Sequence, residues 1–346
     1  MFCPGFRILC SCFIGVVVSG GLFSSHCAIA MTRDQVERSV QAKAFLLVDA
    51  ANNKVLFSRR ADVPYPPAST VKLMTALLVW EHNRLNGTIK VDVSDTRVEP
   101  SHVPLRAGEV VSVRDMTKAL LVGSDNDSAM VLGRKVAGSH SAFLELMNRR
   151  AHELGCRHTV FKTPNGLPAA GQVTTCHDML RIFQKVLEVP ELKEFCSLRG
   201  FTLKTAVGSQ WVKNHNRLLG TFEGMGAAKT GWTYASRHTY AASAQRSGRE
   251  LHLIILNSPN KWTDARLLFE YGFLTTHRKE AVAITKPQVS PPEPVSSGRT
   301  HRVRQGETLY MISLRYGVSM ESLIRMNRIS NPNVIRAGIV LQIPES

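Results

Sequence analysis

The sequence has few of the residues that metal and disulfide sites need, because most of its cysteines fall at one end. It contains seven cysteines, and only Cys156, Cys176 and Cys196 lie beyond residue 30. Three thiols cannot all pair within one chain, so we expect buried free thiols, although the spacing leaves a single disulfide open. Neither these cysteines nor the twelve histidines show metal-ligand spacing, so we expect no metal and no other cofactor.

Apolar runs long enough to span a membrane are also missing after the first thirty residues, which differ from the rest of the chain. Residues 1–30 carry one charge, at Arg7, followed by an apolar run over 13–23 and small residues at 28 and 30. This pattern predicts a secretory signal peptide cleaved after Ala30. An uncleaved anchor is the alternative, but the run is interrupted at 19–21 and is shorter than the ~20 residues that span a bilayer. We expect an exported, periplasmic or otherwise extracytoplasmic protein with no transmembrane anchor in its mature form.

Acidic residues are few relative to basic ones. The chain has 27 Asp and Glu against 43 Lys and Arg, a formal net charge of +16. The excess is spread along the chain, with no basic helix and no aromatic-basic sheet pattern, which argues against nucleic acid as a partner. A diffuse positive field suits an anionic surface outside the cytoplasm better.

Composition divides the chain into a large block and a small one. Residues 285–299 contain four prolines and no apolar periodicity, which is typical of a stiff linker. We therefore expect an enzyme-sized domain over 31–280, a Pro-rich linker over 281–299 and a small domain over 300–346.

Apolar periodicity in the large block predicts an α+β fold. Strands are expected first as a hairpin over 44–49 and 54–58, and again at 199–206, 237–245 and 251–257. Helices are expected from Ser69 to about Asn83 and at 114–122, 125–137, 141–154 and 177–188. Helices in the middle and strands at both ends predict an antiparallel sheet built from both ends of the block and flanked by a helical subdomain.

Ser69 and Lys72 are the first candidates for chemistry. Three residues apart at a helix start, a hydroxyl and an amine lie on one face within contact. A lysine whose pKa is lowered by burial can take the serine proton, and the helix N-terminus offers N–H groups to a developing oxyanion. The spacing alone is weak, because Ser258 and Lys261 repeat it after a strand and with a proline between them.

Two later triplets strengthen the assignment of Ser69. Ser124-Asp125-Asn126 and then Lys229-Thr230-Gly231 follow in order, and the second triplet occurs once in the chain. This ordered set is the signature of penicillin-binding proteins and class A β-lactamases. Residues 67–76, 143–155, 165–167, 174–179, 214–219 and 271–273 further resemble the low-molecular-mass serine D-alanyl-D-alanine carboxypeptidases of peptidase family S11. The likeness covers nearly all of 40–273 and implies a β-lactamase/transpeptidase-like domain.

The resemblance implies catalytic roles for four residues. Ser69 would attack the carbonyl between two D-alanines of a peptidoglycan stem peptide, and Lys72 would be its general base. Ser124 and Lys229 would relay the proton to the departing D-alanine. β-Lactam antibiotics would acylate Ser69 and act as inhibitors.

The resemblance also implies a set of substrate-binding residues. Asn126 would hold the substrate amide and Thr230 the terminal carboxylate, while the backbone N–H groups of Ser69 and Trp232 would form the oxyanion hole beside Gly231. Lys261 stands where the family usually carries an arginine, three residues before an aspartate. A lysine keeps the charge but loses the bidentate fork, so we expect substrate affinity to be affected more than chemistry.

The small block resembles a LysM module along its whole length. The likeness lies in residues 301–309, 316–319, 331–333 and 338–344, and implies a strand-helix-helix-strand fold. It also implies binding to glycans such as peptidoglycan. The residues expected at the sugar are Gly306, Glu307, Thr308, Leu309 and Asn331.

Three alternative functions stay open at this point. A β-lactamase would share every triplet, but class A enzymes add a deacylating glutamate between the second and third motifs, and residues 159–168 contain none. The same serine could instead act on cross-links as a DD-endopeptidase or transpeptidase. The protein could also be a wall-binding protein with an inactive enzyme domain, which the intact triplets disfavour.

Overall fold

The computed structural model describes residues 32–99, 103, 105–206, 208–282, 299–304, 307, 309–316, 318, 320–329 and 335–344. The predicted signal peptide (1–30) and nearly all of the predicted linker (281–299) lie outside these residues, so both stay predictions. Residues 32–282 and 299–344 have separate hydrophobic cores.

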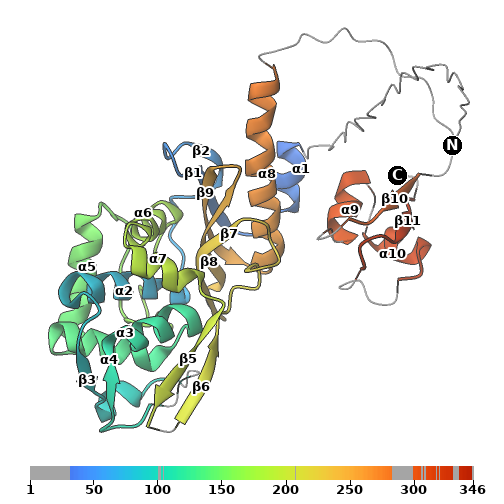
Figure 1. The fold of residues 1–346 in the computed structure, drawn as a ribbon. Coiled ribbons are helices and arrows are strands. Elements are labelled where there is room, and N and C mark those ends of the chain that lie inside the picture. The colour runs from blue at the N-terminus through green and yellow to red at the C-terminus, as the bar shows by residue number, and fades with distance from the viewer. Residues whose placement is uncertain are drawn as a thin grey trace, which may run out of the picture. The chain divides into compact units, whose positions relative to one another are not determined.

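A five-stranded antiparallel sheet forms the centre of the large part, in the order β2-β1-β9-β8-β7 (Figure 1). The N-terminal hairpin of β1 (Ala44–Asp49) and β2 (Val55–Arg59) pairs with β9 (Arg249–Ser258) from the far end of the block. β8 (Arg237–Arg246) and β7 (Met225–Thr233) complete the sheet. The predicted sheet, built from both ends of the block, is therefore confirmed.

Both faces of the sheet are covered, and successive residues alternate between two cores. In β1, Leu46 belongs to one buried cluster while Phe45 and Leu47 belong to the other. α1 (Arg33–Ser39) and α8 (Lys261–Val282) cover the second face, and the helical subdomain covers the first (Figure 1). Because β8 and β9 are buried on both sides, the middle of each is an almost continuous apolar run.

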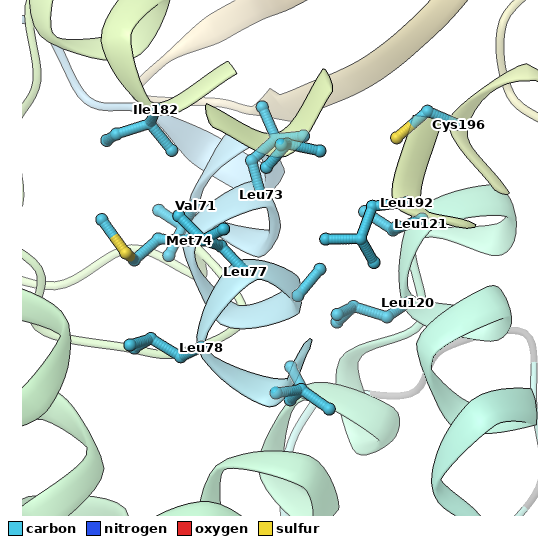
Figure 2. Packing of buried hydrophobic residues seen from close by; sticks show 14 of the residues in the cluster. Val71, Leu73, Met74, Leu77, Leu78, Leu120, Leu121, Ile182, Leu192 and Cys196 are labelled. Carbon is cyan, nitrogen blue, oxygen red and sulfur yellow. The ribbon is translucent and has the colours of Figure 1, made fainter. Parts of the chain in front are cut away.

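The helical subdomain surrounds one buried helix, α2 (Lys72–Asn83). Every residue of α2 from Lys72 to Val79 is buried, as expected for a helix that is apolar on all sides. Figure 2 shows Leu73, Met74, Leu77 and Leu78 among apolar side chains of the neighbouring helices. The other helices of the subdomain are η2 (Val93–Thr96), α3 (Val113–Lys118), η3 (Ala119–Gly123), α4 (Asn126–Ala137), α5 (His140–Glu153), α6 (Cys176–Leu187) and α7 (Pro190–Ser197).

Some local predictions differ from the structure. The helix expected from Ser69 begins at Lys72, because residues 68–71 form the 3-10 turn η1 (Ala68–Val71). The single helix expected over 114–122 is α3 followed by the π-helix η3. Two short hairpins were not predicted in full. They are β3 (Thr88–Lys90) with β4 (Val110–Ser112), and β5 (Gly200–Thr205) with β6 (Gly208–Lys213).

The terminal part has the expected strand-helix-helix-strand order. β10 (Thr300–Arg302) pairs antiparallel with β11 (Val340–Gln342), and α9 (Leu309–Tyr316) and α10 (Met320–Met326) lie between them in the chain. The core of this part consists of Val303, Leu309, Ile312, Leu323, Leu341 and Ile343. Across the whole described chain, none of the helices combines the length and apolar character needed to cross a bilayer.

A buried carboxylate braces α4, the helix that begins at Asn126. Asp95 in η2 has a fully buried side chain and accepts hydrogen bonds from Arg134 Nε at 3.0 Å and Nη2 at 2.7 Å. His140 Nε2 of α5 lies 3.2 Å from the same carboxylate. Asp95 thus ties the η2 segment to two helices of the subdomain.

We expect Asp95→Ala to lower the free energy of unfolding by about 3 kcal/mol, because Arg134 would keep its charge without a partner. Chemical denaturation measures the change. Asp115→Ala is the matched control: its pair with Lys118 is a partly exposed i,i+3 pair at 3.4 Å, worth less than about 1 kcal/mol. Equal losses in the two variants would contradict the bracing role of Asp95.

Candidate active site

The Ser69 hydroxyl lies directly beside the Lys72 amine because of the 3-10 turn that precedes α2. With three residues per turn, positions i and i+3 are stacked one above the other. Lys72 Nζ donates to Ser69 Oγ at 3.0 Å. Pro67 O anchors the turn by accepting hydrogen bonds from Thr70 Oγ1 at 2.7 Å and from Thr239 Oγ1 of β8 at 2.9 Å.

Lys72 is a buried amine whose hydrogen-bond partners are all neutral. Besides Ser69, its Nζ donates to Asn126 Oδ1 at 2.8 Å and to Asn165 O at 2.6 Å. Burial and, next, the charge of Lys229 hold its pKa well below the usual value of a lysine. The neutral amine is therefore favoured more than in a surface lysine, and its lone pair can accept the Ser69 proton.

A second hydroxyl-lysine pair faces the first. Lys229 Nζ of β7 donates to Ser124 Oγ at 2.8 Å and to Thr230 O at 2.9 Å. Burial lowers the pKa of Lys229 to about 7, so both protonation states are accessible near neutrality. Ser124 has a left-handed backbone with φ of 60° and follows a π-helical turn, two features that gather at functional sites.

The Asp125 side chain stabilises the turn formed by residues 124–126. Its buried carboxylate accepts hydrogen bonds from Ser128 N at 2.7 Å and Ser128 Oγ at 2.6 Å, which caps α4. It also accepts from Val103 N at 3.2 Å. The Asn126 side chain at the first position of α4 is thereby aimed at Lys72.

Two glycines let other segments approach the nucleophile. A Cβ on Gly231 of β7 would lie 2.9 Å from Ser69 N, and one on Gly166 would lie at the same distance. Gly166 also has φ of +84°, a conformation that side chains disfavour. Larger residues at either position would push the neighbouring segment away from Ser69 N, where an oxyanion would bind.

The far end of the cleft is rich in positive charge. Lys261 Nζ lies 2.9 Å from His238 Nδ1 of β8 and 4.6 Å from the centre of the Trp262 ring. Burial and, next, the charge of Arg217 lower the pKa of Lys261 to about 8. Burial and, next, Lys261 lower the pKa of His238 to about 4, so the neutral imidazole accepts from the ammonium group. Within the described residues, no carboxylate pairs with Lys261 or Arg217, so this corner can bind the carboxylate of a ligand.

One cleft of about 820 Å³ connects these groups. Lys72 and Lys229 lie buried beneath it. The other catalytic and substrate-binding residues expected from the sequence line it: Ser69, Ser124, Asn126, Thr230, Gly231, Trp232 and Lys261.

Two family models match the chain. A family model described as D-alanyl-D-alanine carboxypeptidase matches residues 30–260, and one described as LysM domain matches residues 301–344. The chain belongs to the D-alanyl-D-alanine carboxypeptidase family. A relative from Mycobacterium tuberculosis, named D-alanyl-D-alanine carboxypeptidase DacB2, is 31% identical over 240 residues. These cover 67% of this chain and 82% of the relative.

Two further relatives bear on fold and activity. A crystal structure of D-alanyl-D-alanine carboxypeptidase from Mycobacterium tuberculosis superposes with a TM-score of 0.65 at 31% identity, covering 68% of this chain and 92% of that one. A D-alanyl-D-alanine endopeptidase from Escherichia coli is 28% identical over 241 residues, 68% of this chain and 77% of the relative. The fold expected from the sequence is thus confirmed as that of penicillin-binding DD-peptidases.

Among the residues of this carboxypeptidase cleft that sequence reasoning missed are Lys213, Arg217 and His238. Arg217 lies in the segment 214–219, whose likeness to the family was the available signal. His238 gave no signal, because its role depends on the pairing of β8 with the segment that leads into α8. The three later cysteines are free and buried, and the described residues contain no cluster of metal-binding groups.

The LysM residues expected to bind sugar fall into two groups. Gly306, Thr308 and Asn331 lie outside the described residues. Glu307 turns inward, with its carboxylate 2.7 Å from both His301 Nε2 and Arg315 Nη1. The Leu309 side chain lies in the core of the module. Both side chains therefore have structural contacts, and the glycan-binding role stays a prediction.

The lowered pKa of Lys261 gives a pH-dependent affinity for a substrate carboxylate. Lysine is positive below its pKa, so the attraction is present below about 8 and is lost as pH rises through that value. Between about pH 7 and about pH 9, we expect the KM for a peptide ending in D-Ala-D-Ala to rise about tenfold, the loss of one hydrogen bond to a charged group. Steady-state kinetics measures it.

Lys261→Arg is the conservative control, because a guanidinium keeps its charge over this range. Its KM should stay nearly constant, while the kcat profile, which depends on Lys72 and Lys229, should keep its wild-type shape. Parallel rises of KM in both proteins would exclude Lys261 as the titrating group.

Proposed function

We propose that this protein is an exported serine-type D-alanyl-D-alanine carboxypeptidase that removes the terminal D-alanine from peptidoglycan stem peptides. The observation that carries the proposal is the facing pair of hydroxyl-lysine contacts, Ser69 with Lys72 and Ser124 with Lys229, in one cleft. Nucleophile, base and proton donor for acyl transfer are all present, and each is a side chain of this chain.

Acylation follows from the geometry. Neutral Lys72 accepts the Ser69 proton as Oγ attacks the carbonyl carbon of the penultimate D-alanine. The backbone N–H groups of Ser69 and Trp232 stabilise the oxyanion, a contribution that is typically worth 10²–10³ in rate per donor. The C–N bond then breaks, and Ser124, paired with Lys229, delivers a proton to the leaving amine. Water hydrolyses the resulting ester and restores Ser69.

A site for the terminal carboxylate of the substrate would explain why the enzyme acts on the last peptide bond of a stem peptide. Thr230 on β7 and the Lys261 ammonium bound to His238 lie in the same cleft as Ser69. A terminal carboxylate bound there would place the preceding peptide bond over Ser69. Binding energy from this non-reacting group orients the scissile bond.

Slow hydrolysis of the β-lactam acyl-enzyme would distinguish the proposed carboxypeptidase from a β-lactamase. Among the described residues that line the cleft, Glu99 is the one acid, and its backbone carbonyl accepts from Asn126 Nδ2 at 3.3 Å. No glutamate follows between residues 159 and 168, where class A enzymes place their deacylating base. A β-lactam acyl-enzyme should therefore persist.

The N-terminal segment and the LysM module fit a cell-wall protein. We infer that residues 1–30 direct export and are removed. We further infer that the LysM module binds the glycan strand and raises the concentration of stem peptides near the cleft, as tethering does for any second binding event.

Covalent penicillin binding tests the proposed catalytic serine. Intact-mass measurement after benzylpenicillin treatment should show one long-lived adduct on the wild type and none on Ser69→Ala, because the ester forms on Ser69 Oγ. Release of D-alanine should be lost in the same variant. An adduct that disappears within seconds would favour a β-lactamase, and an adduct on both proteins would refute the role of Ser69.

Removal of residues 300–346 tests the proposed LysM tether. The catalytic part has cores of its own, so it should stay folded. We expect the shortened protein to lose retention on purified sacculi in a pull-down assay and to keep its turnover of a soluble peptide. Retention equal to that of the full chain would contradict the tether.

A further inference from the structure

A second, smaller cavity opens beside the catalytic cleft and has no part in the mechanism above. Its volume is about 230 Å³, and it shares part of its wall with the cleft, so the two are continuous. Three segments line it: the start of the nucleophile turn at Pro66 and Ala68, the loop over 166–172, and the turn from β7 to β8 at Thr233 and Ala235. We call this cavity the side pocket.

The side pocket differs from the cleft in charge. None of the described residues that line it is ionisable, whereas the cleft wall carries Lys213, Arg217 and Lys261 together with one acid, Glu99. A charged group that entered the side pocket would find no partner of opposite charge there, and an unpaired charge away from water is costly. The side pocket therefore favours an uncharged, apolar group.

The polar side chains in this wall, Gln172 and Thr233, are already hydrogen-bonded within the protein. Gln172 Oε1 accepts from Thr163 N at 2.9 Å, and Gln172 Nε2 donates to Leu167 O at 2.9 Å. Thr233 Oγ1 accepts from Ser236 N at 3.0 Å, and Thr233 N donates to Ser236 Oγ at 3.0 Å. These bonds fix two of the three segments, so the side pocket is formed before a ligand binds.

The side pocket lies on the acyl side of the nucleophile. In the proposed reaction the terminal carboxylate binds at Thr230, and Trp232 N, two residues further along β7, contributes to the oxyanion hole. A substrate that follows β7 in this direction next reaches Thr233 and the turn to β8, which belong to the pocket wall. Lys261, at the leaving-group end of the cleft, is not part of that wall. The residue that precedes D-alanyl-D-alanine is thus the part of the substrate that meets the side pocket.

We propose that the side pocket binds the side chain of the residue that precedes D-alanyl-D-alanine, and that it selects an uncharged aliphatic chain over one that ends in an ammonium group. This assignment rests on the serine carboxypeptidase function proposed above and specifies its substrate class. A volume of about 230 Å³ is large enough for a linear aliphatic side chain. Acylation and hydrolysis proceed as described above, because the pocket wall contributes only contacts.

Three peptides test this preference. They carry acetyl-L-alanine, acetyl-L-norleucine or acetyl-L-lysine in front of D-alanyl-D-alanine and differ in that one side chain. We expect kcat/KM for D-alanine release to be about tenfold higher for norleucine than for alanine, because methylene groups leave water in the pocket. Lysine should be about tenfold poorer than norleucine, because its ammonium group would lose water without gaining a partner.

A carboxylate at the edge of the side pocket should change that order. Ala170 lines the pocket and is exposed, in a turn that Gln172 N closes by donating to Ala169 O at 3.1 Å, so substitution there should leave the fold intact. Ala170→Asp should raise the ratio of kcat/KM for lysine to that for norleucine about fivefold, because the carboxylate attracts the ammonium group. Ala170→Asn has the same shape without the charge and should keep the wild-type ratio.

A larger side chain inside the side pocket gives a second test. Ala169→Leu should lower the ratio of kcat/KM for norleucine to that for alanine to about one, while turnover of the alanine peptide shows that the variant is folded. Equal wild-type values for alanine and norleucine, no disadvantage for lysine, identical ratios in the Asp and Asn variants, or an unchanged ratio in Ala169→Leu would each overturn the proposal. A wild type that releases D-alanine from none of the three peptides would instead count against the serine carboxypeptidase function itself.

Discussion

The proposed chemistry of this protein depends on two lysine side chains that are held in the protein interior and form no salt bridge with any carboxylate of the described residues. Lys72 and Lys229 are almost fully buried, and their hydrogen bonds go to hydroxyl, amide and carbonyl oxygens. Taking an ammonium group out of water costs several kcal/mol, so both groups favour the neutral form more than a surface lysine does. A carboxylate beside either amine would restore the charge and remove the base.

The rest of the fold follows from the need to keep these amines in place. Lys72 is the first residue of a helix that is buried on all sides, and Lys229 is in β7, where the sheet meets η1. Gly166 and Gly231 allow two backbone segments to lie close to Ser69 N, while both amines are buried. The carboxylate of Asp125 accepts hydrogen bonds from the start of α4 and from Val103 N, and its negative charge partly offsets the lowering of the Lys72 pKa.

The residues proposed for catalysis were easier to recognise in the sequence than the geometry around them. Ser69, Ser124 and Lys229 could be recognised because each belongs to a short motif with fixed internal spacing, and the three motifs follow one another in a set order. The sheet could be predicted because strands buried on both faces leave long apolar runs, as in β8 and β9. The short hairpins β3–β4 and β5–β6 could not, since three-residue strands and half-exposed ones carry little periodic signal. The 3-10 turn at Ser69 also has no sequence pattern that separates it from an α-helical start.

The substitution of lysine for arginine at position 261 shows why tertiary contacts cannot be deduced from a motif. From the sequence alone, a lysine at this position loses the two parallel hydrogen bonds that an arginine side chain can donate to a carboxylate. In the structure, the Lys261 ammonium is oriented by His238 from β8 and by the Trp262 ring, and a guanidinium stands nearby on Arg217. The charge and the fork are thus divided between two residues from different elements.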